Sequence, residues 1–195
     1  MPETHPSVVV LSGPNGAGKS TMAARLLVGS LRVSEYVDAD AFARGLPRSK
    51  AVAVTAGRAV LRRLDELAAA RRSFGFETTL ASRSFSPRIR TLIRAGYQCH
   101  LVFLWLPSAD FAVARVADRV RLGGHAVPEE TVRRRYRSGL RNFFGLYQAL
   151  TSTWRIYDNS VHEPRLIASG AGTETLAVDD ADLWRRIRAE ASDED

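Results

Sequence analysis

The sequence is poor in cysteine and has no long apolar segment. Its 195 residues include one cysteine, Cys99, which excludes a disulfide framework and a cysteine-based zinc site. No apolar run reaches the roughly 20 residues needed to cross a bilayer. No basic region precedes the first apolar run, so the N-terminus does not resemble a secretory signal. We therefore expect a cytoplasmic protein without a membrane segment.

Lysine is also scarce, yet the chain is basic. Lys19 and Lys50 are the two lysines among 28 basic residues, against 21 acidic residues, and the formal charge is +7. Four of the acids lie in the last six residues, and we expect residues 190–195 to form a frayed acidic tail. Without that tail the net charge is +11. This charge favours anionic partners such as nucleotides, phosphorylated metabolites or nucleic acid, although an arginine-rich proteome would also produce it.

The spacing of apolar residues predicts an α/β fold. Composition and length fit one soluble globular domain, which we place at residues 1–189. Strands alternate with helices, and this predicts a parallel sheet with right-handed crossovers, flanked by helices. The expected strands are 7–12, 33–38, 73–78, 98–106, 153–158, 165–169 and about 174–178. The expected helices are 18–30, 50–71, 86–96, 108–122, 128–150 and one from about 180.

Residues 13–20 read G-P-N-G-A-G-K-S and match every fixed position of the phosphate loop G-x-x-x-x-G-K-[ST]. The match lies between a predicted strand and a predicted helix, as this motif requires. Its glycines allow backbone N–H groups to turn toward phosphate oxygens, and the helix dipole favours the anion. We expect Lys19 to reach the β- and γ-phosphates of ATP and Ser20 to ligate Mg²⁺. The predicted nucleotide site is Gly13, Pro14, Asn15, Gly16, Ala17, Gly18, Lys19, Ser20 and Thr21.

Other landmarks separate a kinase from an ATPase or a GTPase. The apolar strand 101–106 ends in Leu106-Pro107 rather than in Asp-Glu, and no guanine-binding motif is present. A small kinase instead needs an acid after its second strand, an acid near its third strand and a late arginine-rich lid. All three features occur here, and they favour a phosphotransferase with an alcohol-group acceptor.

Two acids lie at or just after the ends of predicted strands, at the edge of the sheet where ligands bind in such folds. Asp40 can accept the proton of an attacking hydroxyl, and the alternative is a helix N-cap for residues 41–45. Glu77 can bind a substrate hydroxyl or a water of the Mg²⁺ shell, and the alternative is a salt bridge. Thr78 and Thr79 can add hydroxyl contacts.

The predicted lid covers residues 115–137 or so. Arg115 and Arg119 are four apart on one helix, so they share a face and can close on the charge of a transferring phosphoryl group. The Gly-Gly pair at 123–124 would serve as a hinge, and His125 is ambiguous between phosphate contact and loop structure. The alternative is a solvated arginine-rich helix. We read the later arginines at 133–135 and 137 as a solvated face.

Taken in order, several stretches resemble the zeta-toxin family of P-loop kinases, especially its shorter bacterial members. They cover roughly residues 8–170 and include GPNGAGKST, VDADAF, SFGFETTL, RVADRVRLGGHAVPEETVRRRY and WRIYDNS. The resemblance implies Mg-ATP, phosphorylation of a sugar hydroxyl of UDP-N-acetylglucosamine, and an antitoxin as a possible partner. It makes Asp40 the catalytic base and Lys19 a catalytic phosphate-loop residue. The resemblance also implies that Glu77 and Thr79 contact the substrate and that Arg115 is a lid arginine.

The sequence departs from that family at two places. The best-known zeta toxins carry an arginine where His125 falls, which leaves Arg119 as the substitute cation. They also carry an arginine shortly after the Glu-x-Thr of the third strand, where this chain has Ala81 and where Arg83 is the nearest candidate. The expected substrate-binding set is therefore Glu77, Thr79, Arg83 and His125, and the acceptor can be a related metabolite.

Two alternatives remain open at this stage. One is a nucleic-acid 5′-kinase, which the basic charge would suit, but basic residues are not interleaved with stacking aromatics, so a nucleic-acid partner is not expected. The other is a non-catalytic ATP-binding protein that binds a partner. The adenine site is poorly marked, and residues 158–160 are a candidate for it.

Overall fold

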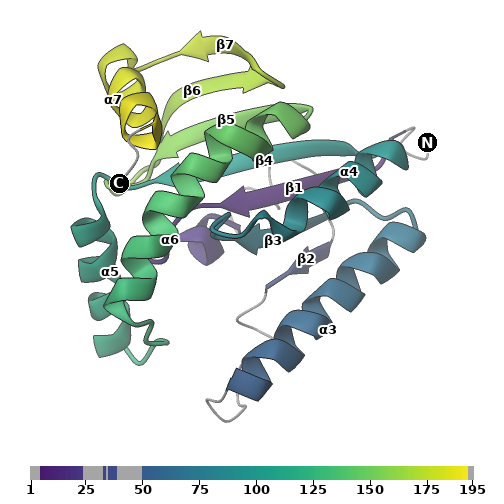
Figure 1. Cartoon of the computed structure of the whole chain (residues 1–195), viewed down its shortest axis with the longest axis horizontal. Coiled ribbons are helices and arrows are strands. Elements are labelled where there is room, and N and C mark those ends of the chain that lie inside the picture. The colour runs from purple at the N-terminus through teal and green to yellow at the C-terminus, as the bar shows by residue number, and fades with distance from the viewer. Residues whose placement is uncertain (1–4, 24–32, 34, 39–49, 193–195) are drawn as a thin grey trace.

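A parallel sheet forms the centre of the fold (Figure 1). The structure is a computed structural model that describes residues 5–23, 33, 35–38 and 50–192. Along the sheet the strand order is β2-β3-β1-β4-β5-β6-β7, and the first five of these are mutually parallel. Their carboxyl ends therefore meet at one edge. These strands are β1 (Ser7–Ser12), β2 (Glu35–Val37), β3 (Phe74–Thr78), β4 (Gln98–Trp105) and β5 (Thr153–Asp158).

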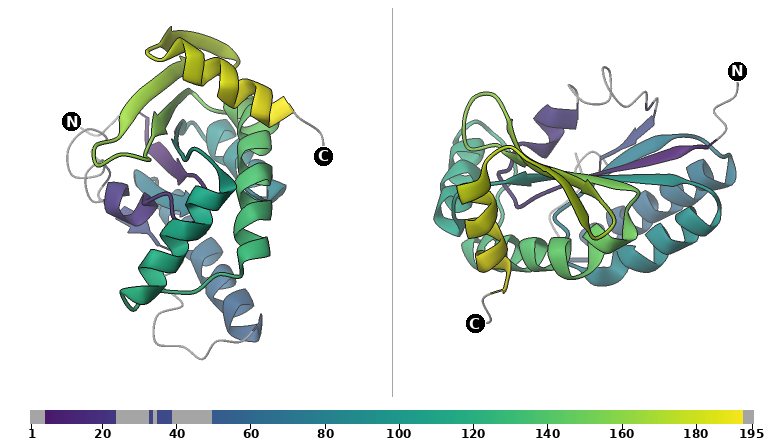
Figure 2. Two further views of the ribbon diagram at one scale, coloured as in Figure 1. Left: turned by 90° about the vertical axis from the view of Figure 1, so that its left-hand side faces the viewer. Right: turned by 90° about the horizontal axis from the view of Figure 1, so that it is seen from above.

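Helices cover both faces of the sheet (Figures 1 and 2). Successive residues of β4 point to opposite faces. Leu101, Phe103 and Trp105 join a core with α3, α4 and α7, whereas Val102 and Leu104 join a second core with α5 and residues 17–23. The helices are α3 (Lys50–Ala69), α4 (Ser86–Arg94), α5 (Ala109–Arg121), α6 (Glu129–Asn142) and α7 (Ala181–Ser192).

The predicted α/β sheet is confirmed. Its last two strands, however, are not parallel to their neighbours as expected. The strands β6 (Arg165–Ala171) and β7 (Glu174–Val178) run antiparallel to their neighbours. Six residues join β5 to β6 and two join β6 to β7, which is too short for the helical crossover that a parallel pair needs. Because these connections are short, β5 and β6 form one hairpin, and β6 and β7 form another.

Several helix boundaries differ from the expectation. The helix predicted at 128–150 is α6, followed by a π-helical turn over Phe143–Tyr147 and a 3-10 turn over Gln148–Leu150. Glu190 of the expected tail belongs to α7. Of the helix predicted at 18–30, residues 19–23 are helical, and its remainder lies outside the described residues, as does Asp40.

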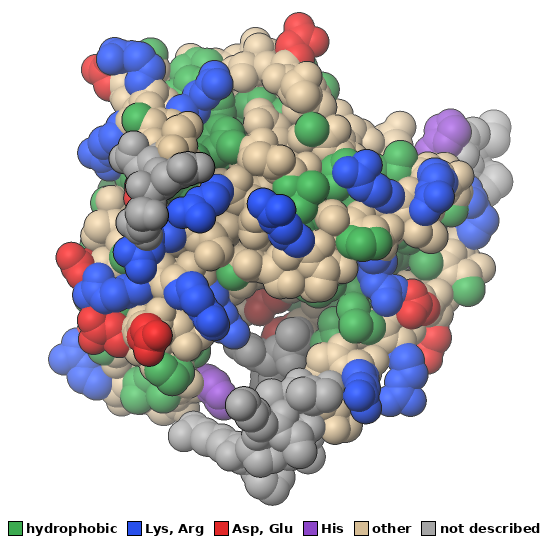
Figure 3. Space-filling model, viewed as in Figure 1, with side chains coloured by type: hydrophobic (Ala, Val, Ile, Leu, Met, Phe, Trp, Pro, Cys, Tyr) green, Lys and Arg blue, Asp and Glu red, His purple; other side chains and the backbone are tan. Residues whose placement is uncertain are grey.

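Basic side chains are spread over the face that carries α4, α6 and α7 rather than gathered in one patch (Figure 3). Within the described ranges, no helix is both long and apolar enough to cross a membrane.

Candidate active site

The segment predicted to be a phosphate loop, residues 13–20, follows β1 and makes close contacts with neighbouring backbone. Gly13 has a φ of +138°, and a Cβ there would lie 2.4 Å from the carbonyl oxygen of Leu104 on β4. Gly16 has a φ of +79°, and its Cβ would lie 2.9 Å from the carbonyl oxygen of Ala112 on α5. Both conformations favour glycine. The loop therefore passes against β4 and α5 in a form that a side chain at these two positions would disturb.

Lys19 folds back over this loop. Its Nζ donates to the carbonyl oxygens of Gly13 and Pro14, each at 3.0 Å. The buried side-chain amide of Asn159 donates to the carbonyl oxygen of Ala17 at 2.6 Å, and this bond connects the loop to the residue after β5. The ammonium group of Lys19 is therefore held against the carbonyl oxygens of residues 13 and 14.

Glu77 is the penultimate residue of β3 and accepts two hydroxyl hydrogen bonds. Its Oε2 accepts from Ser20 Oγ and from Tyr36 OH, both at 3.1 Å. Burial raises the pKa of Glu77; the charge of Lys19 and the two hydroxyl donors lower it, and the charge of Asp38 raises it again, so that the pKa lies above its ordinary value. Burial and the neighbouring carboxylate raise the pKa of Tyr36, which keeps its hydroxyl protonated as a donor.

We expect Glu77→Gln to stabilise the folded protein at pH 7–8. A raised pKa means that the folded state binds the Glu77 proton more tightly than the unfolded chain does. Ionisation therefore costs stability as the pH rises from the ordinary value of 4.5 through the raised pKa, and the full cost is present above it. A neutral amide avoids this cost and still accepts from Ser20 and Tyr36, with an expected gain of about 1 kcal/mol.

Thermal unfolding measured between pH 4 and pH 8 checks this prediction. The difference between Glu77→Gln and wild type should shrink toward pH 4, where the wild-type carboxyl becomes protonated. Glu163→Gln removes an exposed carboxylate outside the cavity and serves as the matched control. A lower melting temperature for Glu77→Gln at pH 8 would contradict the assigned cost of ionisation.

The two predicted lid arginines lie on α5 and bind loop carbonyls. Arg115 Nη1 donates to the carbonyl oxygen of Asn159 at 2.6 Å. Arg119 Nη2 donates to the carbonyl oxygen of His125 at 2.7 Å, and its Nε is buried with no hydrogen-bond partner among the described residues. Arg115 therefore joins α5 to the residue after β5, and Arg119 joins α5 to the loop before α6.

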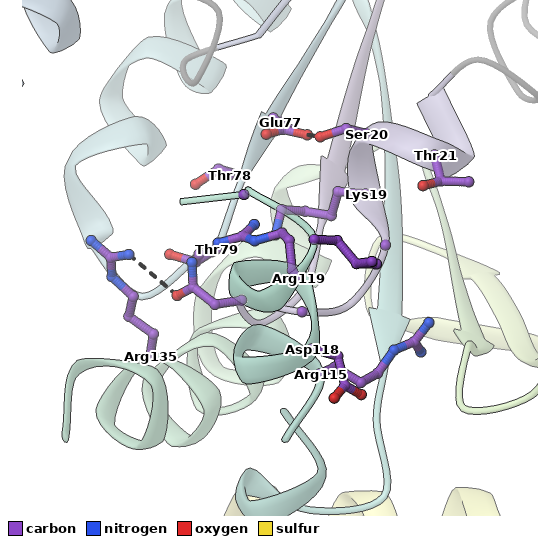
Figure 4. A pocket seen from close by; sticks show the side chains of 15 residues that line it. Lys19, Ser20, Thr21, Glu77, Thr78, Thr79, Arg115, Asp118, Arg119 and Arg135 are labelled. Atoms are coloured by element: carbon purple, nitrogen blue, oxygen red, sulfur yellow. Dashed lines mark hydrogen bonds between the residues drawn. The ribbon is translucent and has the colours of Figure 1, made fainter. Parts of the chain in front are cut away.

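A cavity of about 680 Å³ brings these groups together. Figure 4 shows the hydrogen bond from Ser20 to Glu77 on one side and basic side chains from α5 and α6 around it. The cavity has cations from three segments, Lys19, the arginines of α5 and Arg135 of α6, and the half-buried carboxylate of Glu77, which suits a phosphorylated ligand that carries a hydroxyl. Its lining includes Asn15, Gly16, Gly18, Lys19, Ser20, Thr21, Glu77, Thr78, Thr79, Arg115, Asp118, Arg119, Leu122, Gly124 and Arg135.

A second cavity of about 270 Å³ adjoins the first and shares Gly18, Thr21 and Arg115 with it. Residues of the β5–β6 connection close its far side, including His162 and Pro164. Of the adenine candidates at 158–160, Asn159 lines this cavity, whereas the Asp158 carboxylate is bound to Arg165.

Arg83 and His125, both predicted to bind substrate, are not among the residues that line either cavity. Arg83 is exposed, and its Nε donates to Asn142 Oδ1 at 3.4 Å. Asn142 also donates to the carbonyl oxygen of Leu80 at 2.7 Å, and Tyr147 OH donates to that of Ser82 at 2.6 Å. These bonds hold the segment after β3 against α6. His125 is exposed and contributes its backbone oxygen to Arg119.

Sequence reasoning missed Arg135. It lines the large cavity, and its Nη1 donates to Asn15 Oδ1 of the phosphate loop at 3.2 Å. The signal was present: Arg135 is three residues after Val132 and one before Tyr136, both of which are buried. An arginine on the inward stripe of an amphipathic helix points to a polar partner inside.

The family model described as "Zeta toxin" matches residues 1–163. An uncharacterized protein of Haemophilus influenzae (strain Rd) is 29% identical over 126 residues, which cover 64% of this chain and 88% of that protein. Among solved structures, AvrRxo1-ORF1:-ORF2 with ATP aligns with a TM-score of 0.72 and 18% identity, over 98% of this chain and 66% of that chain.

A structure of the PezAT chromosomal toxin-antitoxin system of Streptococcus pneumoniae aligns with a TM-score of 0.65 and 14% identity, over 97% of this chain and 85% of that one. This chain spans 63% of the length of the matched chains in two further structures of the AvrRxo1-ORF1:AvrRxo1-ORF2 complex. At these identities the structural likeness concerns the fold. Because the family model covers most of the sequence, the chain belongs to the zeta toxin family and has a kinase-like α/β fold.

Proposed function

We propose that this protein is an ATP-dependent phosphotransferase that transfers the γ-phosphate to a hydroxyl group of a sugar nucleotide such as UDP-N-acetylglucosamine, or of a related metabolite. One observation carries the proposal. The cavity joins the phosphate-loop Lys19 and Ser20 to Glu77 at the end of β3, beside arginines from α5. Phosphate-binding cations and a hydroxyl-binding carboxylate within one cavity fit a kinase better than a nucleotide-binding module.

The two cavities suggest how ATP would lie. The phosphates would occupy the large cavity over the loop, with Lys19 near the β- and γ-phosphates. The adenosine would occupy the second cavity, which Gly18, Thr21 and Arg115 connect to the first. Arg115 would then contact the nucleotide from between the two cavities.

The donor set also fits Mg²⁺. Ser20 Oγ, bonded to Glu77 Oε2, is the hydroxyl that the motif assigns to the ion, and Glu77 would accept from a water of its shell. A bound Mg²⁺ neutralises charge on the β- and γ-phosphates. The remaining work falls to this chain's own residues. They orient the acceptor hydroxyl, exclude water and hold the phosphates.

In the proposed reaction the acceptor hydroxyl oxygen attacks the γ-phosphorus. A bond forms between that oxygen and phosphorus as the bond from phosphorus to the β–γ bridging oxygen breaks, and ADP leaves with the electron pair. The hydroxyl proton passes to the carboxylate of Asp40 as general base. Arg115 and Arg119 meet the charge on the transferring group. We propose residues 115–137 as the lid of one kinase domain over residues 1–189.

The experiment that tests this function identifies the product. The purified protein is incubated with Mg²⁺, γ-labelled ATP and a bacterial metabolite extract, and labelled products are separated and identified by mass spectrometry. A labelled sugar nucleotide is the expected result. A labelled oligonucleotide in a parallel incubation would overturn the proposal in favour of a 5′-kinase. ATP binding without any labelled product would indicate a non-catalytic protein.

We also propose a protein antitoxin as partner, because the family resemblance implies one, and we keep the cytoplasm as the proposed location. The PezAT structure concerns a toxin-antitoxin system, which supports the first proposal. Co-expression with a candidate antitoxin, followed by co-purification, tests the partner.

A further inference from the structure

We infer that Arg135 of α6 binds the γ-phosphate of ATP and so distinguishes ATP from ADP. This inference rests on the proposed function for its catalytic consequence, but not for its binding consequence. Arg135 is outside the phosphate-loop motif and lies 120 residues from its contact in that loop.

Arg135 and Lys19 converge on the same end of the phosphate loop. Lys19 Nζ lies 3.0 Å from the carbonyl oxygens of Gly13 and Pro14, and Asn15 is the next residue along the loop. Arg135 Nη1 donates to Asn15 Oδ1 at 3.2 Å, and both cations line the same cavity. Because a phosphate-loop lysine reaches the β- and γ-phosphates, a guanidinium at this end lies near the terminal phosphate.

The helix that carries Arg135 is fixed at several points. Tyr136 OH donates to the carbonyl oxygen of Leu106 at 2.8 Å in a buried bond. At Gly139 the helix approaches the chain after β3 so closely that a Cβ would lie 2.4 Å from the carbonyl oxygen of Thr79. Asn142 donates to the carbonyl oxygen of Leu80 at 2.7 Å. Arg135 is therefore held over the loop before ligand binds, and a preorganised donor stabilises charge without reorganisation.

Arg115 has a different place. Figure 4 shows Arg115 and Arg135 on opposite sides of Lys19, and Arg115 also lines the second cavity. Its guanidinium is bound at 2.6 Å to the carbonyl oxygen of Asn159, at the adenosine side of the proposed nucleotide path. The bond of Arg135 to a neutral amide oxygen at 3.2 Å is longer and is exchangeable for a charge-assisted bond to a phosphate oxygen. Arg115 thus contacts the nucleotide between its adenosine and its phosphates, whereas Arg135 contacts the terminal phosphate.

The test compares ADP with a non-hydrolysable β,γ-imido analogue of ATP, both with Mg²⁺, by isothermal titration calorimetry. For Arg135→Ala we expect about tenfold weaker binding of the analogue and an ADP affinity within about twofold of wild type. In the transfer reaction kcat should fall about 10²-fold, the effect of removing one donor to transition-state charge. Arg135→Lys keeps the charge without the planar fork and should give an intermediate loss. Arg134→Ala, which removes the exposed neighbour on α6, is the matched control and should bind both ligands as wild type does.

An equal loss for ADP and for the analogue, or no loss for either, overturns the inference. The melting temperature of each variant is measured alongside. If Arg135→Ala does not fold, Arg135→Lys and Arg135→Gln decide the matter by the same comparison. The binding measurements need no acceptor. If no acceptor is ever labelled while Arg135→Ala weakens the binding of the analogue and leaves the binding of ADP unchanged, the proposed function fails and this inference stands.

Discussion

Lys19→Ala should lower kcat/KM for ATP-dependent transfer about 10³-fold and weaken the binding of Mg-ATP. The Lys19 ammonium lies over the phosphate loop, 3.0 Å from two of its carbonyl oxygens, and a phosphate would replace these as its partner. Its charge is needed by the bound nucleotide and more strongly by the transition state, where negative charge spreads over the transferring oxygens. Steady-state kinetics and calorimetry with Mg-ATP measure the two effects.

The composition of the chain offers a second measurement on the wild-type protein. Lys19 and Lys50 are its two lysines, so acylation by an amine-specific reagent can be followed by mass spectrometry at each of them. Mg-ATP should protect Lys19 and leave the modification of Lys50 unchanged. Full activity of a folded Lys19→Ala variant, or equal protection of both lysines, would contradict the role given to Lys19.

The turn at residues 13–18 between β1 and the following helix could be predicted because the motif that specifies it is local. Eight consecutive residues set both the backbone turn and the cation, and the flanking strand and helix follow from short apolar patterns. The strands were predictable for the same reason, since each is a run of a few apolar residues between turn signals. The antiparallel direction of β6 and β7 was harder to predict from the sequence. Only the shortness of their connections separates a hairpin from a parallel pair.

The cavity depends on contacts between distant segments, and these were only partly predictable. Glu77 could be expected near the loop because the ends of parallel strands share an edge of the sheet. The observed register agrees, since it pairs Leu11 of β1 with Glu77 of β3. The hydrogen bond from Tyr36 to Glu77 could not be expected, because it depends on how two side chains from different strands meet. Arg83 lies outside both cavities because the chain turns at Leu80, which has a φ of +54°, and the following residues bind to α6.

Arg135 was missed for a physical reason. The run of arginines at 133–137 is typical of a solvated helix face. Arg133 fits that description, since it pairs with Asp110 and Glu129. Arg135 instead shares the inward face of α6, and its partner Asn15 is far away in sequence. Composition describes the run as a whole, whereas helical periodicity assigns each arginine to a face.

Asp40→Asn should lower the transfer rate about 10³-fold while the dissociation constant for Mg-ATP stays within about twofold of wild type. Asparagine keeps the size and a hydrogen-bonding oxygen but cannot accept the proton that the attacking hydroxyl loses, and general base catalysis contributes typically 10²- to 10⁴-fold. Single-turnover transfer with saturating Mg-ATP measures the chemical step, and calorimetry measures nucleotide binding. The split between the two distinguishes a base from a residue that holds the nucleotide.

Asp38→Asn is the matched comparison, because it makes the same change two residues earlier in the chain. Asp38 directly follows β2, whose Val37 pairs with Phe76, so it lies beside the end of β3 that carries Glu77. Its charge raises the pKa of Glu77, and removing it should lower that pKa and change the transfer rate by tenfold or less. Full transfer by Asp40→Asn would refute its role as base. An equal loss in Asp38→Asn with intact nucleotide binding would show that the segment, rather than the carboxylate of Asp40, is what transfer requires.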